Sequence, residues 1–163
     1  MVMQTMRHPF RRWLASALIL LAQVGITSTL TAGQLSDYEW QNRPLLLFAP
    51  DSDDPRLQQT RTRLDQHRCE LDDRQMILGE FVAQGQSRLA GKPVTGQTAA
   101  NLRERYGIEP GQFAVILIGK DGGEKYRLYE VPELDGIFAL IDGMPMRQNE
   151  MAQNPVDCGK DSP

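Results

Sequence analysis

Residues Leu45–Pro55 read Leu-Leu-Leu-Phe-Ala-Pro-Asp-Ser-Asp-Asp-Pro and are the most informative segment for the fold of this chain. A continuous apolar run of this length is typical of a β-strand that is buried on both faces. The acidic loop after it ends in Asp54 and Pro55, an N-cap followed by a proline at the first helical position. In α/β proteins, ligands gather just past the carboxyl end of a strand. This strand–loop–helix junction is therefore where a functional site is expected.

Three further strands are predicted after this junction. They are expected at Gln75–Val82, at Gln112–Ile118 and at Glu124–Glu130. Asp121-Gly122 is a strong hairpin signal and predicts that the last two strands pair antiparallel. The segment Ala83 to Gly96 is rich in Gly, Gln, Ser and Pro, which predicts a long loop.

Three helices are predicted between and after the strands. The first begins at Pro55, and the last begins at Pro132. The second is capped by Thr95 or Thr98 and ends at Gly107, a residue suited to a left-handed C-terminal position. The resulting order is β-α-β-α-β-β-α, and strands separated by helices are expected to pair parallel. The prediction is an α/β fold with a four-stranded mixed sheet flanked by helices.

The first 32 residues have the layout of a secretory signal peptide. Three basic residues, Arg7, Arg11 and Arg12, precede a mostly apolar run at Trp13–Ile26, and small residues follow up to Ala32. Cleavage after Ala32 predicts a periplasmic or secreted protein. It also predicts contact with a membrane only through this segment, before it is removed.

An uncleaved membrane anchor is the alternative interpretation of the same segment. Gln23 and Gly25 interrupt the apolar run, which is shorter than the roughly 20 residues that a transmembrane helix needs. The layout therefore favours cleavage, leaving one domain over residues 33–151. The tail at 152–163 is rich in turn-forming residues and is expected to be disordered.

Removal of residues 1–32 leaves a clearly acidic domain. It keeps 15 basic and 21 acidic residues, a net charge of −6. Phosphate contacts need clusters of Lys and Arg, so binding to nucleic acid is not expected.

Both cysteines, Cys69 and Cys158, lie after the cleavage site. In an exported domain, two cysteines can form one disulfide. The residues alone leave an intramolecular bridge, free thiols and intermolecular pairing open. Cys69 is expected at the end of the first helix, where the helix dipole disfavours a thiolate. His67 lies two residues before it and so on another face of a helix, which argues against a Cys–His nucleophile.

The acidic loop offers two interpretations. Asp51, Asp53 and Asp54 could bind a divalent cation through clustered carboxylate oxygens. Turn and cap chemistry explains the same residues without a ligand, because Asp side chains accept hydrogen bonds from free helix N–H groups. A phosphatase of the haloacid-dehalogenase type also places Asp-x-Asp after an apolar strand, but it needs a larger domain with a distant Lys and acidic pair in set places, and Pro50 sits awkwardly before Asp51. Capping is the favoured interpretation, and no cofactor is predicted.

Two further segments are candidate sites, one rich in glycine and one that contains two methionines. Gly119–Gly123 lacks the spacing of a phosphate-binding loop and is explained by the hairpin turn. The string Met144, Pro145, Met146, Arg147 has two equally supported interpretations. It forms either an exposed docking patch, since Met suits adaptable surfaces, or a seal over the end of the last helix.

Particular residues resemble those of known proteins. Arg105–Ile108 and Gly119–Gly122 are similar to the helix end and hairpin of thioredoxins, and Leu45–Pro55 falls at their active-site junction. Over Trp40–Met151 the chain more specifically resembles the domain of unknown function numbered 4174. The matching segments are Arg43–Pro50, Phe113–Gly123 and Ile141–Met151. That family occurs in secreted bacterial proteins and in animal sushi-repeat-containing matrix proteins. The resemblance implies a thioredoxin-like or peroxiredoxin-like fold and brings no established catalytic residues.

The chain departs from the redox pattern at both decisive places. Asp51–Asp54 stands where thioredoxins carry a dithiol with a lowered pKa. Carboxylates at this place would raise the pKa of a neighbouring thiol. Gly111-Gln112 stands where thioredoxins place a cis-proline. We therefore expect an exported, non-catalytic module that binds an unknown protein or envelope component. The alternative is a thiol oxidoreductase or peroxiredoxin-like enzyme that uses Cys69 or Cys158.

Overall fold

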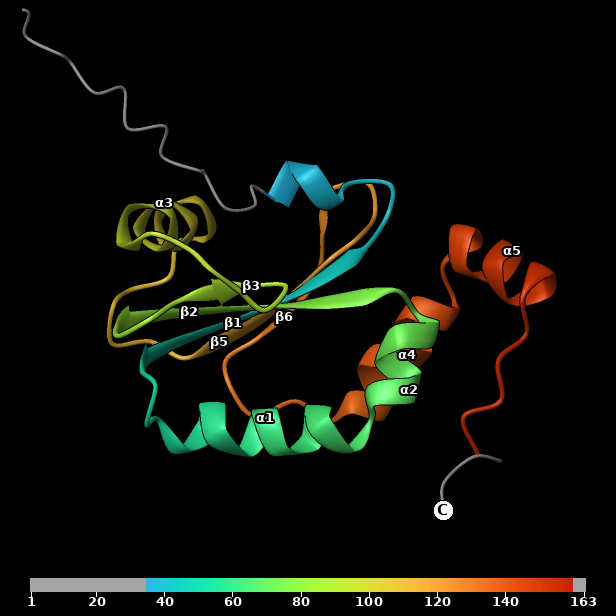
Figure 1. Ribbon diagram of the computed structural model, residues 1–163, viewed down its shortest axis with the longest axis horizontal. Coiled ribbons are helices and arrows are strands. Elements are labelled where there is room, and N and C mark those ends of the chain that lie inside the picture. Colours follow the sequence, from blue (N-terminus) through green and yellow to red (C-terminus); the bar gives the residue numbers. More distant parts are fainter. Residues whose placement is uncertain (1–34, 160–163) are drawn as a thin grey trace, which may run out of the picture.

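The computed structural model of the chain describes residues 35–159, so the predicted signal segment lies outside the described residues. Its centre is a mixed sheet in the order β4-β3-β2-β1-β5-β6 (Figure 1). The strands are β1 (Arg43–Asp51), β2 (Met76–Gln84), β3 (Arg88–Leu89), β4 (Lys92–Pro93), β5 (Ala114–Ile118) and β6 (Glu124–Leu128).

Helices cover both faces of this sheet (Figure 1). They are the 3₁₀-helix η1 (Leu35–Tyr38) and the α-helices α1 (Pro55–Gln66), α2 (Arg68–Asp73), α3 (Gly96–Tyr106), α4 (Leu134–Asp142) and α5 (Pro145–Gln153). Side chains of α1, α2 and α4 pack on one face, and those of α3 and η1 pack on the other. Within residues 35–159, no helix is both long enough and apolar enough to span a membrane.

The predicted α/β layering is confirmed, but the predicted number of four strands was too low, because the sheet has six. The predicted loop between Ala83 and Gly96 contains the two short strands β3 and β4, which form a hairpin that pairs with β2. The turn between them uses positive φ angles at Ala90 (48°) and Gly91 (75°). Strands of two residues are too short to show alternation of apolar and polar side chains, so no periodic pattern marks them.

The direction predicted for the strand at Gln112–Ile118, which corresponds to β5, was also wrong. β1 and β2 pair parallel, as expected, whereas β1 and β5 pair antiparallel. The end of β2, the start of α3 at Gly96 and the connection at Pro110 all line one cavity. The chain thus enters β5 at the edge of the sheet where β2 ended, and it must then run the opposite way.

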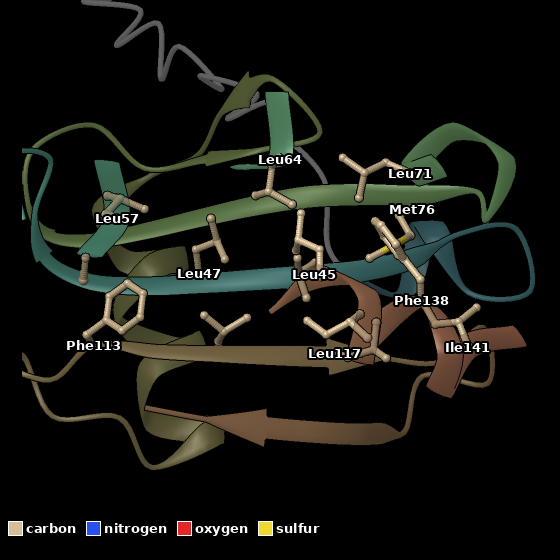
Figure 2. Close-up of a cluster of buried hydrophobic side chains, with 14 of the residues drawn as sticks. Leu45, Leu47, Leu57, Leu64, Leu71, Met76, Phe113, Leu117, Phe138 and Ile141 are labelled. Carbon is tan, nitrogen blue, oxygen red and sulfur yellow. The ribbon is translucent and has the colours of Figure 1, made fainter. Parts of the chain in front are cut away.

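The central strand β1 is buried on both faces, as its apolar run predicts. Leu45 and Leu47 point into the core beneath α1 and α4, as Figure 2 shows. Leu46 and Phe48 point into the second core, beneath α3. Each face of the sheet therefore has its own hydrophobic core, and β1 contributes to both.

The predicted helix ends at Asp54, Thr95 and Gly107 are confirmed. The Asp54 carboxylate accepts a hydrogen bond from the Arg56 N–H and caps α1. The Thr95 hydroxyl accepts one from the Thr98 N–H. Gly107 adopts the left-handed conformation, with φ of 64°, at the end of α3.

Two details at the other end of the sheet differ from the expectation. The first helix ends at Gln66, and Cys69 lies near the start of the separate short helix α2, not at the carboxyl end of α1. The boundary expected after residue 151 falls inside α5, which continues to Gln153. The segment that was expected to be disordered is therefore helical in its first two residues.

Candidate functional site

The acidic loop uses two of its carboxylates to fix its own backbone. Asp51 Oδ1 accepts a hydrogen bond from the Asp53 N–H (2.9 Å). Asp54 Oδ1 accepts from the backbone N–H of Arg56 (2.9 Å) and from its Nε (3.0 Å), and Oδ2 accepts from Nη2 (2.6 Å). The hydrogen bonds from the Arg56 side chain lower the pKa of Asp54, although burial acts in the opposite direction. This is the cap chemistry that the sequence favours.

The metal-binding interpretation finds no complete ligand set here. Across the part of the chain that the structure describes, no three His, Cys, Asp or Glu side chains converge as metal ligands. In the loop itself, Asp54 is engaged by Arg56, and the Ser52 hydroxyl donates to Asp53 at 3.5 Å.

The two cysteines lie far from this loop. Cys69 and Cys158 form a disulfide in the structure, with an S–S distance of 2.07 Å. Cys69 follows α1, which begins at the loop and runs for 12 residues. At 1.5 Å per residue, α1 alone separates the loop from the disulfide by about 18 Å. The bridge ties α2 to the segment after α5. Figure 1 shows α2 at the opposite end of the sheet from the start of α1, which is the expected redox position.

Beneath α5 lies a network of buried ion pairs. Glu150 accepts two hydrogen bonds from the guanidinium of Arg43 (3.0 and 3.2 Å) and one from Lys120 Nζ (2.7 Å). Arg147 pairs with Asp73 and, at 3.2 Å, with Asp142. Burial raises the pKa of Glu150, but the hydrogen bonds from Arg43 and Lys120 outweigh it, so the net direction is downward. The network fixes α5 against the amino end of β1.

Part of the Met144–Arg147 string seals the end of α4, as one interpretation predicted, and part is exposed, as the other predicted. Arg147 is buried in the ion-pair network, and Met144 packs against the core beneath α4, so both seal the end of that helix. Met146 is 40% exposed and faces a groove of about 360 Å³. Trp40, which is 66% exposed, lines the same groove together with Pro145. The exposed part of the string thus belongs to a mainly apolar groove, defined here as the α5 groove, which the charged residues Lys120, Asp121 and Lys125 also line.

Sequence reasoning missed Arg103, although a signal was present. Arg103 lies in α3 between the buried residues Leu102 and Tyr106, and four residues after buried Ala99. This spacing puts its side chain on the apolar face of the helix, where a charge is costly. The exposure of Trp40 was not predicted, because the exposure of a single aromatic residue cannot be read from the sequence.

Known proteins resemble this chain over most of its length. It is 25% identical over 147 residues to human "Sushi repeat-containing protein SRPX2" and 26% identical over 135 residues to zebrafish "Coiled-coil domain-containing protein 80". These alignments cover 88% and 72% of this chain but only 32% and 16% of the relatives. The chain therefore corresponds to a minor part of each of these longer proteins.

Solved structures with a similar fold are peroxiredoxins. The reduced 2-Cys peroxiredoxin of Plasmodium vivax aligns with a TM-score of 0.53 at 15% identity, covering 71% of this chain and 84% of that one. Thioredoxin peroxidase I of Plasmodium yoelii aligns with a TM-score of 0.51 at 18% identity, covering 79% and 85%. Identities this low show the thioredoxin-like fold and nothing of the chemistry.

A family model assigns the chain directly. It matches residues 34–150, which include every element of the sheet and both cores. Its description is "Domain of unknown function (DUF4174)". The match agrees with the resemblance at Arg43–Pro50 and at Ile141–Met151, and the chain belongs to the DUF4174 family.

Proposed function

We propose that this protein is an exported, non-catalytic thioredoxin-like module that binds a polypeptide partner through the α5 groove. The observation that carries the first half is the position of the cysteines. A redox thiol of this fold works at the start of α1, where the helix N-terminus lowers its pKa. Here that position holds Asp51–Asp54, and both thiols are joined in a bridge at the other end of the sheet.

The α5 groove supports the second half of the proposal. Its walls include an exposed Trp and two Met side chains, Trp40, Met144 and Met146. Trp is enriched among the residues that dominate binding energy at interfaces, and Met adapts its shape to different partners. The ion pairs of Glu150 and Arg147 hold α5 in place, so Met146 is presented by a fixed helix. A polypeptide with an exposed apolar side chain fits these walls.

The first test concerns the absence of catalysis. We expect the purified protein to reduce insulin disulfides and to consume peroxide no faster than the Cys69→Ser/Cys158→Ser variant. The physical reason is that the two sulfurs are joined in one disulfide, so neither is a free thiolate, and neither lies at the start of α1. A dithiol thioredoxin at the same concentration serves as the positive control. Turnover that depends on either cysteine would establish the oxidoreductase alternative instead.

The second test concerns the groove. A photo-crosslinking amino acid placed at Met146 is expected to capture a partner polypeptide in intact cells, and the Trp40→Ala substitution is expected to lower the yield at least fivefold. The matched control is the same amino acid at Gln148, which is exposed on the same helix and does not line the groove. Equal capture from both positions, or capture of a second copy of this chain alone, would contradict the proposed partner site.

A further inference from the structure

A second hollow lies at the carboxyl end of β2, on the face of the sheet that α3 covers. It has a volume of about 460 Å³ and is lined by the end of β2, the β2–β3 connection and one side of α3. Ligand pockets commonly occupy roughly 300–1,000 Å³. The hollow is defined here as the Arg103 cavity, because Arg103 alone carries a charge among the described residues that line it.

Arg103 is a buried cation without a carboxylate partner. Only 6% of the residue is exposed. Its guanidinium donates to three backbone carbonyls, those of Ala49, Phe81 (2.6 Å) and Glu109 (3.2 Å). Its Nε is buried and has no hydrogen-bond partner. None of the ion pairs between described residues includes it, whereas the buried Arg43 and Arg147 are both paired with carboxylates.

This isolation is energetically unfavourable in the free protein. A buried charge that lacks a counter-charge is costly, and carbonyl dipoles compensate for it only in part. Burial lowers the pKa of Arg103, with no carboxylate acting in the other direction. An anion that entered the cavity would supply the missing counter-charge. The low local dielectric would strengthen that attraction relative to water.

The other walls of the cavity also suit an anion. Thr95 and Gly96 bring the start of α3 to it, and a helix N-terminus carries a partial positive charge. Ser87 and Gln86 add polar side chains, and no acidic residue lines the cavity within the described chain. Ala99 adds an apolar wall, which would contact the uncharged part of an organic molecule.

We infer that the Arg103 cavity binds a small organic anion, with its carboxylate or phosphate group toward Arg103 and the start of α3 and its apolar part against Ala99. The site lies at the carboxyl edge of the sheet, where ligands of open α/β folds gather. It is separate from the α5 groove, and the two proposals succeed or fail independently. No bond is made or broken in this role.

The probes that test this inference are benzoate, phenyl phosphate and the neutral analogue benzamide. Each is titrated at constant ionic strength into the purified protein while backbone amide NMR shifts are recorded. We expect saturable shifts at Ser87 and Gly96 with at least one anion, at least tenfold tighter than with benzamide. The stronger of the two anions identifies the preferred group. Unsaturable shifts, or equal binding of benzamide, would overturn the inference.

Gly96→Asp is the decisive variant. A Cβ at Gly96 meets no atom within 4 Å, and an acidic residue is favourable in the first turn of a helix, so the variant should fold. Its carboxylate would repel an anion from the cavity, and we expect binding to weaken at least tenfold. Gly136→Asp makes the same change in α4, outside this cavity, and should leave binding within twofold. Equal effects of both variants would overturn the inference.

Discussion

Replacing Glu150 with Ala is expected to lower the free energy of unfolding by about 3 kcal/mol, because it leaves Arg43 and Lys120 buried without a counter-charge. Arg43 is 1% exposed and Glu150 has a side chain that is 19% exposed, so the pair is screened little by water. Urea unfolding of the purified protein measures the change. The matched control is Glu133→Ala. The Glu133 carboxylate pairs with Arg63 at the surface, so this substitution should lower the free energy of unfolding by less than about 1 kcal/mol.

The same pair gives the stability a defined pH dependence. The pKa of Glu150 is held below its ordinary value of 4.5 in the folded protein. A depressed carboxyl pKa stabilises the fold fully above the unfolded value, and the stabilisation is lost as the pH falls through the folded value. Stability should thus decline below about pH 4.5, and Glu150→Gln should make that decline shallower. If Glu150→Ala and Glu133→Ala lowered the free energy of unfolding equally, the proposed stabilisation by the buried ion pairs of Glu150 would be wrong.

Replacing Phe48 with Ala is expected to be at least as damaging, at about 4 kcal/mol. Phe48 is fully buried, and its ring lies 5.3 Å from the ring of Phe81 and 6.1 Å from that of Tyr106. The Arg103 guanidinium lies 5.7 Å from the ring centre. The substitution therefore removes a large apolar volume and one wall against which the buried cation packs.

The control for Phe48→Ala is Phe48→Leu, which keeps most of the apolar volume and should cost about 1–1.5 kcal/mol. Both are measured by urea unfolding, with an unchanged m-value showing that the unfolded state is comparable. A cost below about 1.5 kcal/mol for the Ala variant would mean that the second core collapses around the missing ring.

The sequence was most informative where local chemistry decides the structure. The apolar run at Leu45–Ala49, the cap at Asp54 and the glycine at Gly107 each depend on a few neighbouring residues, and each was predicted correctly. The antiparallel direction of β5 was not, because the path of the connection around α3 is a tertiary property. No local pattern records on which side of the sheet a helix packs.

The candidate sites were less predictable for a related reason. Arg43 and Glu150 are 107 residues apart in the sequence, so their pairing follows only from the finished fold. The acidic loop was correctly interpreted as a cap, since Asp54 and Arg56 are neighbours. The Arg103 cavity is formed by β2, α3 and the connection at Pro110, which meet only in the folded chain. The one feature of this cavity that the sequence indicates is the position of Arg103 on an apolar helix face.

The bridge between Cys69 and Cys158 also determines how the protein would respond to proteolysis. It joins two residues that are 89 positions apart in the sequence and closes a covalent ring that includes β2 to β6. A single backbone cut anywhere inside that ring leaves both fragments attached to each other. The second core is formed largely by residues within the ring, so its segments would remain parts of one covalently linked molecule. The fragments of a nicked molecule would separate in electrophoresis only after reduction, because the disulfide keeps them covalently joined until then.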